Sequence, residues 1–250
     1  MLSVIKIGGS VLRDAASFDA VAGFISRRLP ANREERLIVI VSAEYGATDA
    51  LLEEARSIAP EPSEEALDLL WSTGELRSVA RLSLHLQRLG VHAAPLNVHQ
   101  TGLTSADGRA TVRPMLILAA LAHTRVAVVP GFLAVRPGGG IRSLGRGGSD
   151  LTAVLVAVAL RAQQCELVKD VAGYYSSDPH EHADAIPIRD LTIAEALGMA
   201  EAGCNLVQLA ALEAAGAASL PLVVRCLSVD SQVTYVHPHA TLPAHVAACQ

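Results

Sequence analysis

The sequence predicts a single α/β domain in which a largely parallel β-sheet is covered by helices on both faces. Short apolar runs typical of buried strands alternate along the chain with segments of helical periodicity, and this alternation is the pattern of a parallel sheet with crossover helices. The chain has 250 residues, of which 51% are hydrophobic, so it is long enough to bury one large core. No internal repeat or linker divides it.

The first half of the chain supplies these elements in order. Residues 2–7 and 36–41 form buried strands, and residues 15–29 form a helix that Pro30 and Asn32 end. The remaining elements expected in this half are a helix near 46–58, helical sequence to Leu89 with a break at 72–74, a strand-like run at 91–98, a loop that can form a hairpin at 100–113, a helix near 114–122 and a strand at 125–129.

The second half opens with a glycine-rich loop at 136–148. Thr192 and Glu195 fit a capping box that starts a helix. The other expected elements are a helix at 149–162, a strand at 165–169, an alanine-rich packed helix at 208–219 and strands at 221–227 and 232–236. Sheets of this kind bind ligands outside the carboxyl ends of their strands, so the turns after 2–7, 125–129 and 165–169 are where a site is expected.

Composition excludes several classes of protein. A net charge of −5 with high apolar content argues against disorder and against a nucleic-acid binder, which usually has a basic face. No signal peptide or membrane span is evident. The cysteines form no CxxC pair and lie at Cys165, Cys204, Cys226 and Cys249. We therefore expect a reduced, soluble, cytoplasmic protein with neither nucleic-acid nor membrane partners.

The first motif is Lys6 followed by Gly8, Gly9 and Ser10 at a strand end. The glycines would let backbone N–H groups approach a phosphate, and the lysine could neutralise charge during phosphoryl transfer. A plain tight turn with a snorkelling lysine remains the alternative. Of the 20 basic residues in the chain, only Lys6 and Lys169 are lysines.

The second motif runs from Leu144 to Asp150 and opens a helix. Ser149 and Asp150 lie at the helix N-terminus, and Arg146 offers a fork suited to a carboxylate. An ordinary Ser149 N-cap beside a surface loop is the alternative.

Two further segments carry candidate chemistry. Residues 169–179 hold Asp and Tyr side chains able to contact a nucleotide, although an Asx-type turn with a packed Tyr would look the same. Residues 72–75 read as a capping box when taken alone.

In this order and spacing, the motifs resemble the catalytic domain of aspartate kinases, in the amino acid kinase superfamily. The resemblance covers nearly the whole chain, and the string Leu-Gly-Arg-Gly-Gly-Ser-Asp at 144–150 is its most specific part. The other matching segments are Lys6-Ile7-Gly8-Gly9-Ser10, Val41-Ser42-Ala43 with Thr48-Asp49, Gly74-Glu75, Gly131-Phe132 and the altered segment 169–179.

The resemblance implies a fold and a reaction. The fold is a three-layer αβα sandwich, one domain over 1–250, with the acceptor bound by about 1–130 and the nucleotide by about 131–250. The reaction is transfer of phosphate from ATP, with Mg²⁺, to the side-chain carboxylate of L-aspartate. A homodimer and a role in amino-acid biosynthesis are also implied.

Residue roles come from the same resemblance. Lys6 would stabilise the transferring phosphoryl group and Asp150 would organise the catalytic centre, while Arg146 would hold the α-carboxylate and Glu75 the α-ammonium. The implied aspartate contacts are Ser42, Ala43, Thr48, Glu75, Phe132, Arg146 and Ser149. The implied nucleotide contacts are Gly8, Gly9, Ser10, Gly147, Gly148, Lys169, Asp170, Tyr175, Asp178, Pro179 and Asn205. No resident metal site is expected. The His-x-His pairs 180/182 and 237/239 are interpreted as solvated loop histidines, and Trp71 is interpreted as a core residue rather than a stacking platform.

The nucleotide side departs from the family pattern. Lys169 stands where the family has Thr, Asn205 where it has a phosphate-binding Lys, and Ala172, His180 and Gln208 also differ. One hypothesis is that Lys169 replaces the lost cation; the other is a weakened nucleotide site. Two alternative functions stay open: a kinase for another amino acid or small acid in a specialised pathway, or a non-catalytic nucleotide- or oxyanion-binding homologue. Because the sequence includes no regulatory domains, we expect no inhibition by lysine or threonine.

Overall fold

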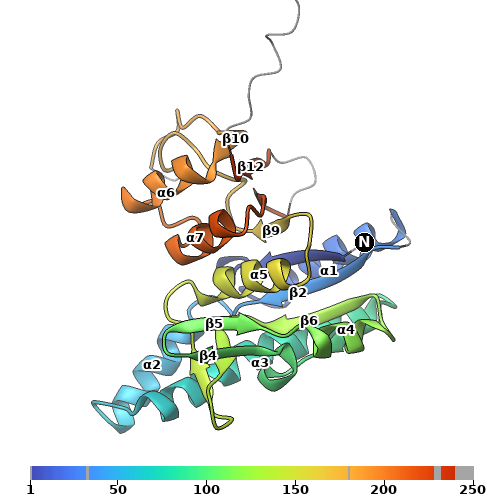
Figure 1. Cartoon of the computed structure of the whole chain (residues 1–250), viewed down its shortest axis with the longest axis vertical. Coiled ribbons are helices and arrows are strands. Elements are labelled where there is room, and N and C mark those ends of the chain that lie inside the picture. Colours follow the sequence, from blue (N-terminus) through green and yellow to red (C-terminus); the bar gives the residue numbers. More distant parts are fainter. Residues whose placement is uncertain (1, 32–33, 180, 228–231, 240–250) are drawn as a thin grey trace, which may run out of the picture.

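The computed structural model describes residues 2–31, 34–179, 181–227 and 232–239. Its main sheet is built from the strands β1 (Leu2–Ile7), β2 (Arg36–Val41), β3 (Ala93–Pro95), β6 (Val126–Pro130), β9 (Cys165–Val168), β10 (Asp190–Thr192), β11 (Leu222–Arg225) and β12 (Thr234–His237). They lie in the order β10-β12-β11-β9-β1-β2-β6-β3 (Figure 1). Neighbouring strands are parallel except β11 and β12, which are antiparallel.

A smaller sheet adjoins the β6 end of the main one. It has the strands β4 (Leu103–Ala106), β5 (Arg109–Val112), β7 (Leu133–Val135) and β8 (Ile141–Ser143), in the order β5-β4-β7-β8. The β4–β5 pair confirms the hairpin predicted for 100–113. Treating 136–148 wholly as loop was wrong, because β8 pairs antiparallel with β7 inside it.

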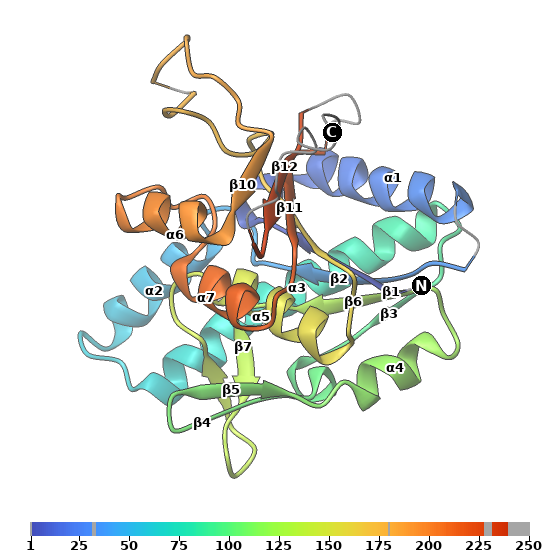
Figure 2. The same ribbon diagram turned by 45° about the horizontal axis from the view of Figure 1, so that its top comes forward.

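Helices cover both faces of the main sheet. They are α1 (Ala15–Ala31), α2 (Ala47–Ile58), α3 (Glu64–Arg88), α4 (Met115–Leu121), α5 (Gly148–Ala159), α6 (Ile193–Glu201) and α7 (Leu209–Ala217), with short 3₁₀ turns at Gly9–Val11 and Val98–Thr101. Figure 2 shows α1 on one side of the sheet and α5 with α7 on the other. Alternate side chains of β1 enter two separate cores, Val4 on the α5 face and Ile5 on the α1 face. This confirms the three-layer αβα sandwich.

Two predicted boundaries were wrong for local reasons, and a third is shifted. Helix α1 ends at Ala31, two residues beyond the predicted Leu29 and just before Asn32. The run at 91–98 forms only the short edge strand β3, which ends at Pro95, and proline is tolerated on an edge strand. Helix α3 has no break at 72–74, because the hydroxyls of Ser72 and Thr73 donate to carbonyls one turn back rather than opening the helix.

The register of the sheet brings the candidate turns together. β1 lies between β2 and β9, and Ile7 pairs with Val41 on one side and with Val168 on the other. The turns that start at Gly8, Ser42 and Lys169 therefore leave the same edge side by side. β6 pairs with β2 one strand further on and delivers Gly131 to the same edge. None of the helices in the described part of the chain combines the length and apolar character needed for a membrane span.

Candidate active site

The two lysines of the chain share one buried carboxylate. Lys6 Nζ lies 2.8 Å from Asp150 Oδ1, and Lys169 Nζ lies 2.8 Å from Asp150 Oδ2. Asp150 is 2% exposed and Lys6 6% exposed, so this is a buried cluster of two positive charges and one negative charge. With all three groups ionised, the cluster has a net charge of +1 and lies at the carboxyl edge of the main sheet.

Strand alternation explains why both lysines face α5. On β1, Lys6 follows Val4 by two residues, and Val4 packs in the core under α5. Lys169 follows Leu167 of β9 by two residues, and Leu167 packs in the same core. Asp150 meets them because it lies in the first turn of α5, where a carboxylate is favoured by the helix dipole.

The two lysine charges keep the Asp150 carboxylate ionised. Burial alone would raise the pKa of Asp150, but the charges of Lys169 and Lys6 outweigh it and hold that pKa well below its usual range. Burial is also the largest influence on Lys169, whose pKa is lowered although Asp150 opposes the change. The Lys169 ammonium is therefore a poorly solvated cation held by one carboxylate.

Glu75 is a second buried carboxylate in this region. It lies on α3 and is 2% exposed, and the Ala43 N–H donates to it. Its Oε2 has no hydrogen-bond partner among the described residues. Burial raises its pKa to about 8, against the opposing effects of the Ala43 N–H and the Lys6 charge. An unpaired buried oxygen of this kind fits a donor supplied by a ligand.

Glycines let the turns approach one another closely. A Cβ on Gly9 would lie 2.9 Å from the Ala43 carbonyl oxygen, and a Cβ on Gly131 would lie 2.8 Å from Ser149 Cβ. The Gly8 N–H already donates to the Val168 carbonyl at 2.9 Å, so it is not free to bind a phosphate. The predicted anion nest therefore cannot use the Gly8 N–H in this conformation.

Phe132 has a strained backbone. Its φ is 68°, and the Leu133 N–H donates to the Gly131 carbonyl across it at 2.8 Å, which is the hydrogen-bond pattern of a γ-turn. Such a conformation costs roughly 1–3 kcal/mol for a non-glycine residue and persists only where its surroundings hold it. Strain of this kind clusters at functional sites.

A cavity of about 650 Å³ lies beside the segment 169–179. The predicted nucleotide residues that line it are Ser10, Lys169, Asp170, Tyr175, Asp178, Pro179 and Asn205. Gly8, Gly9, Gly147 and Gly148 are not among its lining residues. Tyr174 lines it as a packed side chain, 1% exposed, and burial raises its pKa. Lys169 thus joins the lysine–aspartate cluster to a cavity large enough for a small-molecule ligand.

Several predicted residues have other contacts. Gly147 is the N-cap of α5, and the side chain of Gln208 fills the space where its Cβ would be. Asn205 donates to the Gly203 carbonyl at 3.1 Å, and the Ser10 hydroxyl donates to Asp170 at 3.0 Å. The Ser149 N-cap alternative was wrong, because the cap is Gly147 and Ser149 packs against Gly131.

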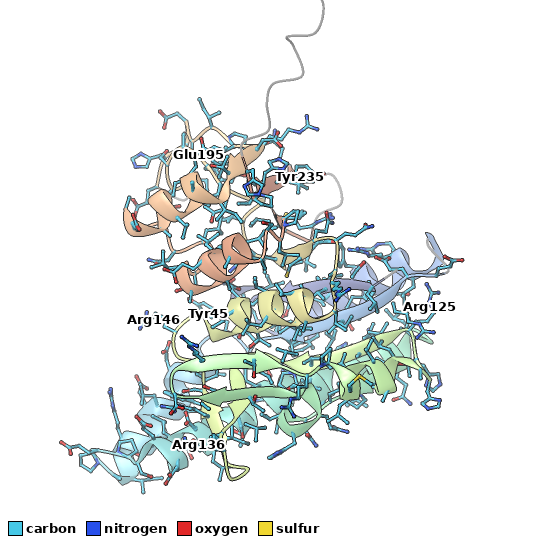
Figure 3. All side chains as sticks on the ribbon, viewed as in Figure 1. Tyr45, Arg125, Arg136, Arg146, Glu195 and Tyr235 are labelled. Carbon is cyan, nitrogen blue, oxygen red and sulfur yellow. The ribbon has the colours of Figure 1, made fainter. Side chains whose placement is uncertain are left out.

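The structure brings only some of the predicted acceptor residues together. Ser42 and Ala43 follow β2 directly, and Ala43 contacts both Gly9 and Glu75. Arg146 is exposed on the loop ahead of α5 (Figure 3), and no hydrogen bond or ion pair among the described residues joins it to Glu75. Thr48 lies in the first turn of α2. The capping-box reading of 72–75 was wrong, since Glu75 lies in the middle of α3.

The contacts of Trp71 were not predicted from the sequence. It is only half-buried, and its Nε1 donates to the Thr48 carbonyl at 3.1 Å. Its ring meets Phe132 edge-on, with centroids 5.6 Å apart. The available signal was its position four residues before Glu75, which places both on one helix face.

No metal centre is evident in residues 2–31, 34–179, 181–227 and 232–239, where no three His, Cys, Asp or Glu side chains cluster. His237 instead pairs with Asp190 at 2.9 Å. Cys165, Cys204 and Cys226 are free thiols. His180 and Cys249 lie outside the described residues.

Comparison with known proteins gives one family and several relatives. The profile of the amino acid kinase family matches residues 1–226. An aspartokinase of Thermus thermophilus is 40% identical over 214 residues, covering 82% of this chain and 52% of the relative. This chain therefore spans about half the length of such curated relatives.

Solved structures agree with this match. The aspartate kinase from Synechocystis has a TM-score of 0.85 at 34% identity, over 97% of this chain and 41% of that one. The structure of E. coli aspartokinase III in complex with aspartate and ADP has a TM-score of 0.75 at 23% identity, over 95% and 65% of the two chains. The second likeness shows the fold.

Proposed function

Since the chain belongs to the amino acid kinase family, we propose that it transfers the γ-phosphoryl group of ATP to the side-chain carboxylate of L-aspartate. The observation that carries this proposal is the cluster of Lys6, Asp150 and Lys169 between two binding regions. Lys169 lines the 650 Å³ cavity, and the Lys6 charge acts on the buried Glu75. A phosphoryl group passing from the cavity towards Glu75 would therefore cross the cluster.

The acceptor side would bind an amino acid. The unpaired Oε2 of Glu75 would accept from the α-ammonium group, and Arg146 would swing from its exposed position to hold the α-carboxylate. Ser42, Ala43, Thr48, Phe132 and Ser149 would complete the pocket. A specific contact to the ammonium distinguishes amino acids from other small acids.

Charge neutralisation would carry the chemical step. The attacking carboxylate is already a nucleophile, so the site needs no strong general base, and positioning with charge neutralisation is sufficient. Lys6 and Lys169 would bind the oxygens of the transferring phosphoryl group, and Asp150 would hold both ammonium groups in place beforehand. Lys169 would thus supply the cation that Asn205 does not.

Mg²⁺ would arrive bound to ATP. The ion prefers phosphate oxygens with one or two protein carboxylates, and Asp170 and Asp178 both line the cavity. These two residues fit that donor set, and the bound ion would neutralise phosphate charge.

The wider context follows from the same proposal. Residues 1–130 would bind mainly the acceptor and residues 131–250 mainly the nucleotide, and the protein would act as a cytoplasmic homodimer in amino-acid biosynthesis. Light scattering of the purified chain checks the dimer.

An ADP-release assay with a panel of amino acids tests the function. Turnover with L-aspartate as the preferred acceptor supports the proposal. Preferred turnover with another acid would assign a different acceptor, and ATP binding without any turnover would favour the non-catalytic alternative.

A further inference from the structure

The Trp71 indole joins two separate acceptor-side elements. Through Nε1 it donates to the carbonyl of Thr48, 3.1 Å away in the first turn of α2. Its ring lies edge-on to Phe132, with the planes 69° apart and the centroids 5.6 Å apart. One side chain therefore spans from the start of α2 to the turn between β6 and β7.

Both of these elements need support from outside. The N-cap of α2 is Gly46, which gives no side-chain hydrogen bond to the first turn of that helix. Phe132 keeps a φ of 68° in a γ-turn, a conformation that neighbouring contacts must hold. Trp71 contacts both the first turn of α2 and the Phe132 turn.

Helix α3 provides a rigid base for these contacts. Trp71 lies one turn before Glu75 on the same face, and Gly74 allows close packing, since a Cβ there would lie 3.2 Å from Ala43 Cβ. Asp68, on the preceding turn of α3, pairs at 2.8 Å with Arg136, which directly follows β7. The Phe132 turn and the end of β7 are thus both attached to α3.

We infer that Trp71 is a positioning residue for acceptor binding, one that sets the distance of Thr48 and Phe132 from Glu75 without itself joining the chemistry. The inference rests on the proposed function, because it assigns these three residues to one acceptor pocket. Because Trp71 does not line the 650 Å³ cavity, we expect changes at Trp71 to alter acceptor binding and to leave nucleotide binding unaffected.

Steady-state kinetics of the full chain separate the two contacts. Trp71→Phe keeps a ring against Phe132 and removes the Nε1 donor, so we expect KM for L-aspartate to rise about fivefold, the equivalent of one neutral hydrogen bond. Trp71→Leu also removes the edge contact and should raise KM about twentyfold or more. In both variants KM for ATP should change less than about twofold.

One control variant and one binding measurement accompany the kinetics. Leu84→Ala changes an exposed apolar residue on the same helix and should leave KM for aspartate unchanged. Trp71 is the only tryptophan in the sequence, so wild-type emission should change saturably as L-aspartate is added, independently of turnover.

The outcomes distinguish the inference from the function on which it rests. Raised KM for aspartate with unchanged KM for ATP supports it. Wild-type turnover beside a Trp71→Phe variant with unchanged KM for aspartate, or with both KM values raised alike, would overturn it and leave the function standing. A wild type that turns over no acceptor would overturn the proposed function and this inference together.

Discussion

The pH dependence of acceptor binding should be set by Glu75. Burial raises its pKa from 4.5 to about 8, although the Ala43 N–H and the Lys6 charge oppose the change. In the proposed site the acceptor ammonium binds the ionised carboxylate, so a protonated Glu75 must first lose its proton. KM for L-aspartate should therefore fall as the pH rises towards 8 and level off above it.

The size of the effect follows from that pKa. With a pKa of about 8, roughly one hundredth of Glu75 is ionised at pH 6, about a tenth at pH 7 and about half at pH 8. KM for aspartate should then fall about ninefold from pH 6 to 7, about fivefold from pH 7 to 8 and less than about twofold above that.

Initial-rate kinetics from pH 6 to 9 on three proteins test this. Wild type should follow the profile above, and Glu75→Gln should show a high KM without that slope because its amide cannot ionise. Glu64→Gln, a matched change at an exposed position on the same helix, should behave as wild type. A wild-type KM that does not vary between pH 6 and 8, or a Glu75→Gln profile with the same slope, would refute the reasoning.

Stability provides a second measurement that needs no substrate. The folded-state pKa of Glu75 lies above 4.5, so the contribution of its neutral form is fully present below pH 4.5 and is lost as the pH rises through 8. The whole change corresponds to about 5 kcal/mol. In urea unfolding, Glu75→Gln should become progressively more stable than wild type between pH 5 and 8; a constant difference would contradict the assignment.

The remaining predictions concern the lysine cluster and the close-packed turns. Lys169→Ala should weaken ATP binding about tenfold to a hundredfold in calorimetric titration, and unchanged ATP affinity would rule out that Lys169 replaces the missing phosphate-binding lysine. Lys169→Arg should also lose activity, because a planar guanidinium cannot replace a compact ammonium. Asp150→Asn leaves two buried ammonium groups without their shared anion and should lower the free energy of unfolding by about 3–5 kcal/mol in urea, whereas an unaltered value would show that the pairs contribute nothing. Gly131→Ala should lower stability by about 1–3 kcal/mol in thermal denaturation through collision with Ser149, and adding Ser149→Gly should restore it; no rescue would place the strain elsewhere.

Much of the fold could be predicted because its central strands are rich in apolar and β-branched residues. β1, β2 and β6 read clearly from the sequence since both of their faces are buried. The short strands β8 and β10 were missed, because three-residue strands carry no periodicity and depend on their partners. The break predicted in α3 arose from Ser72 and Thr73, whose hydroxyl bonds inside the helix leave no trace in the sequence.

The sequence predicted where the candidate site lies better than it predicted the contacts between the site's side chains. Strand ends in a parallel sheet identify the turns at Gly8, Ser42 and Lys169. That Lys6 and Lys169 share Asp150 depends on strand register and on where α5 starts, and the sequence does not state either. Trp71 donates its hydrogen bond to a backbone carbonyl, an acceptor that every residue has, so no sequence motif predicts this contact.

Trapping of an acyl phosphate tests the central proposal most directly. When hydroxylamine is added to the chain with ATP, Mg²⁺ and L-aspartate, phosphorylation of the side-chain carboxylate should yield aspartyl hydroxamate in step with ADP release, and Asp150→Asn should yield far less. ADP release without hydroxamate, or no ADP release in the presence of L-aspartate, would contradict the account.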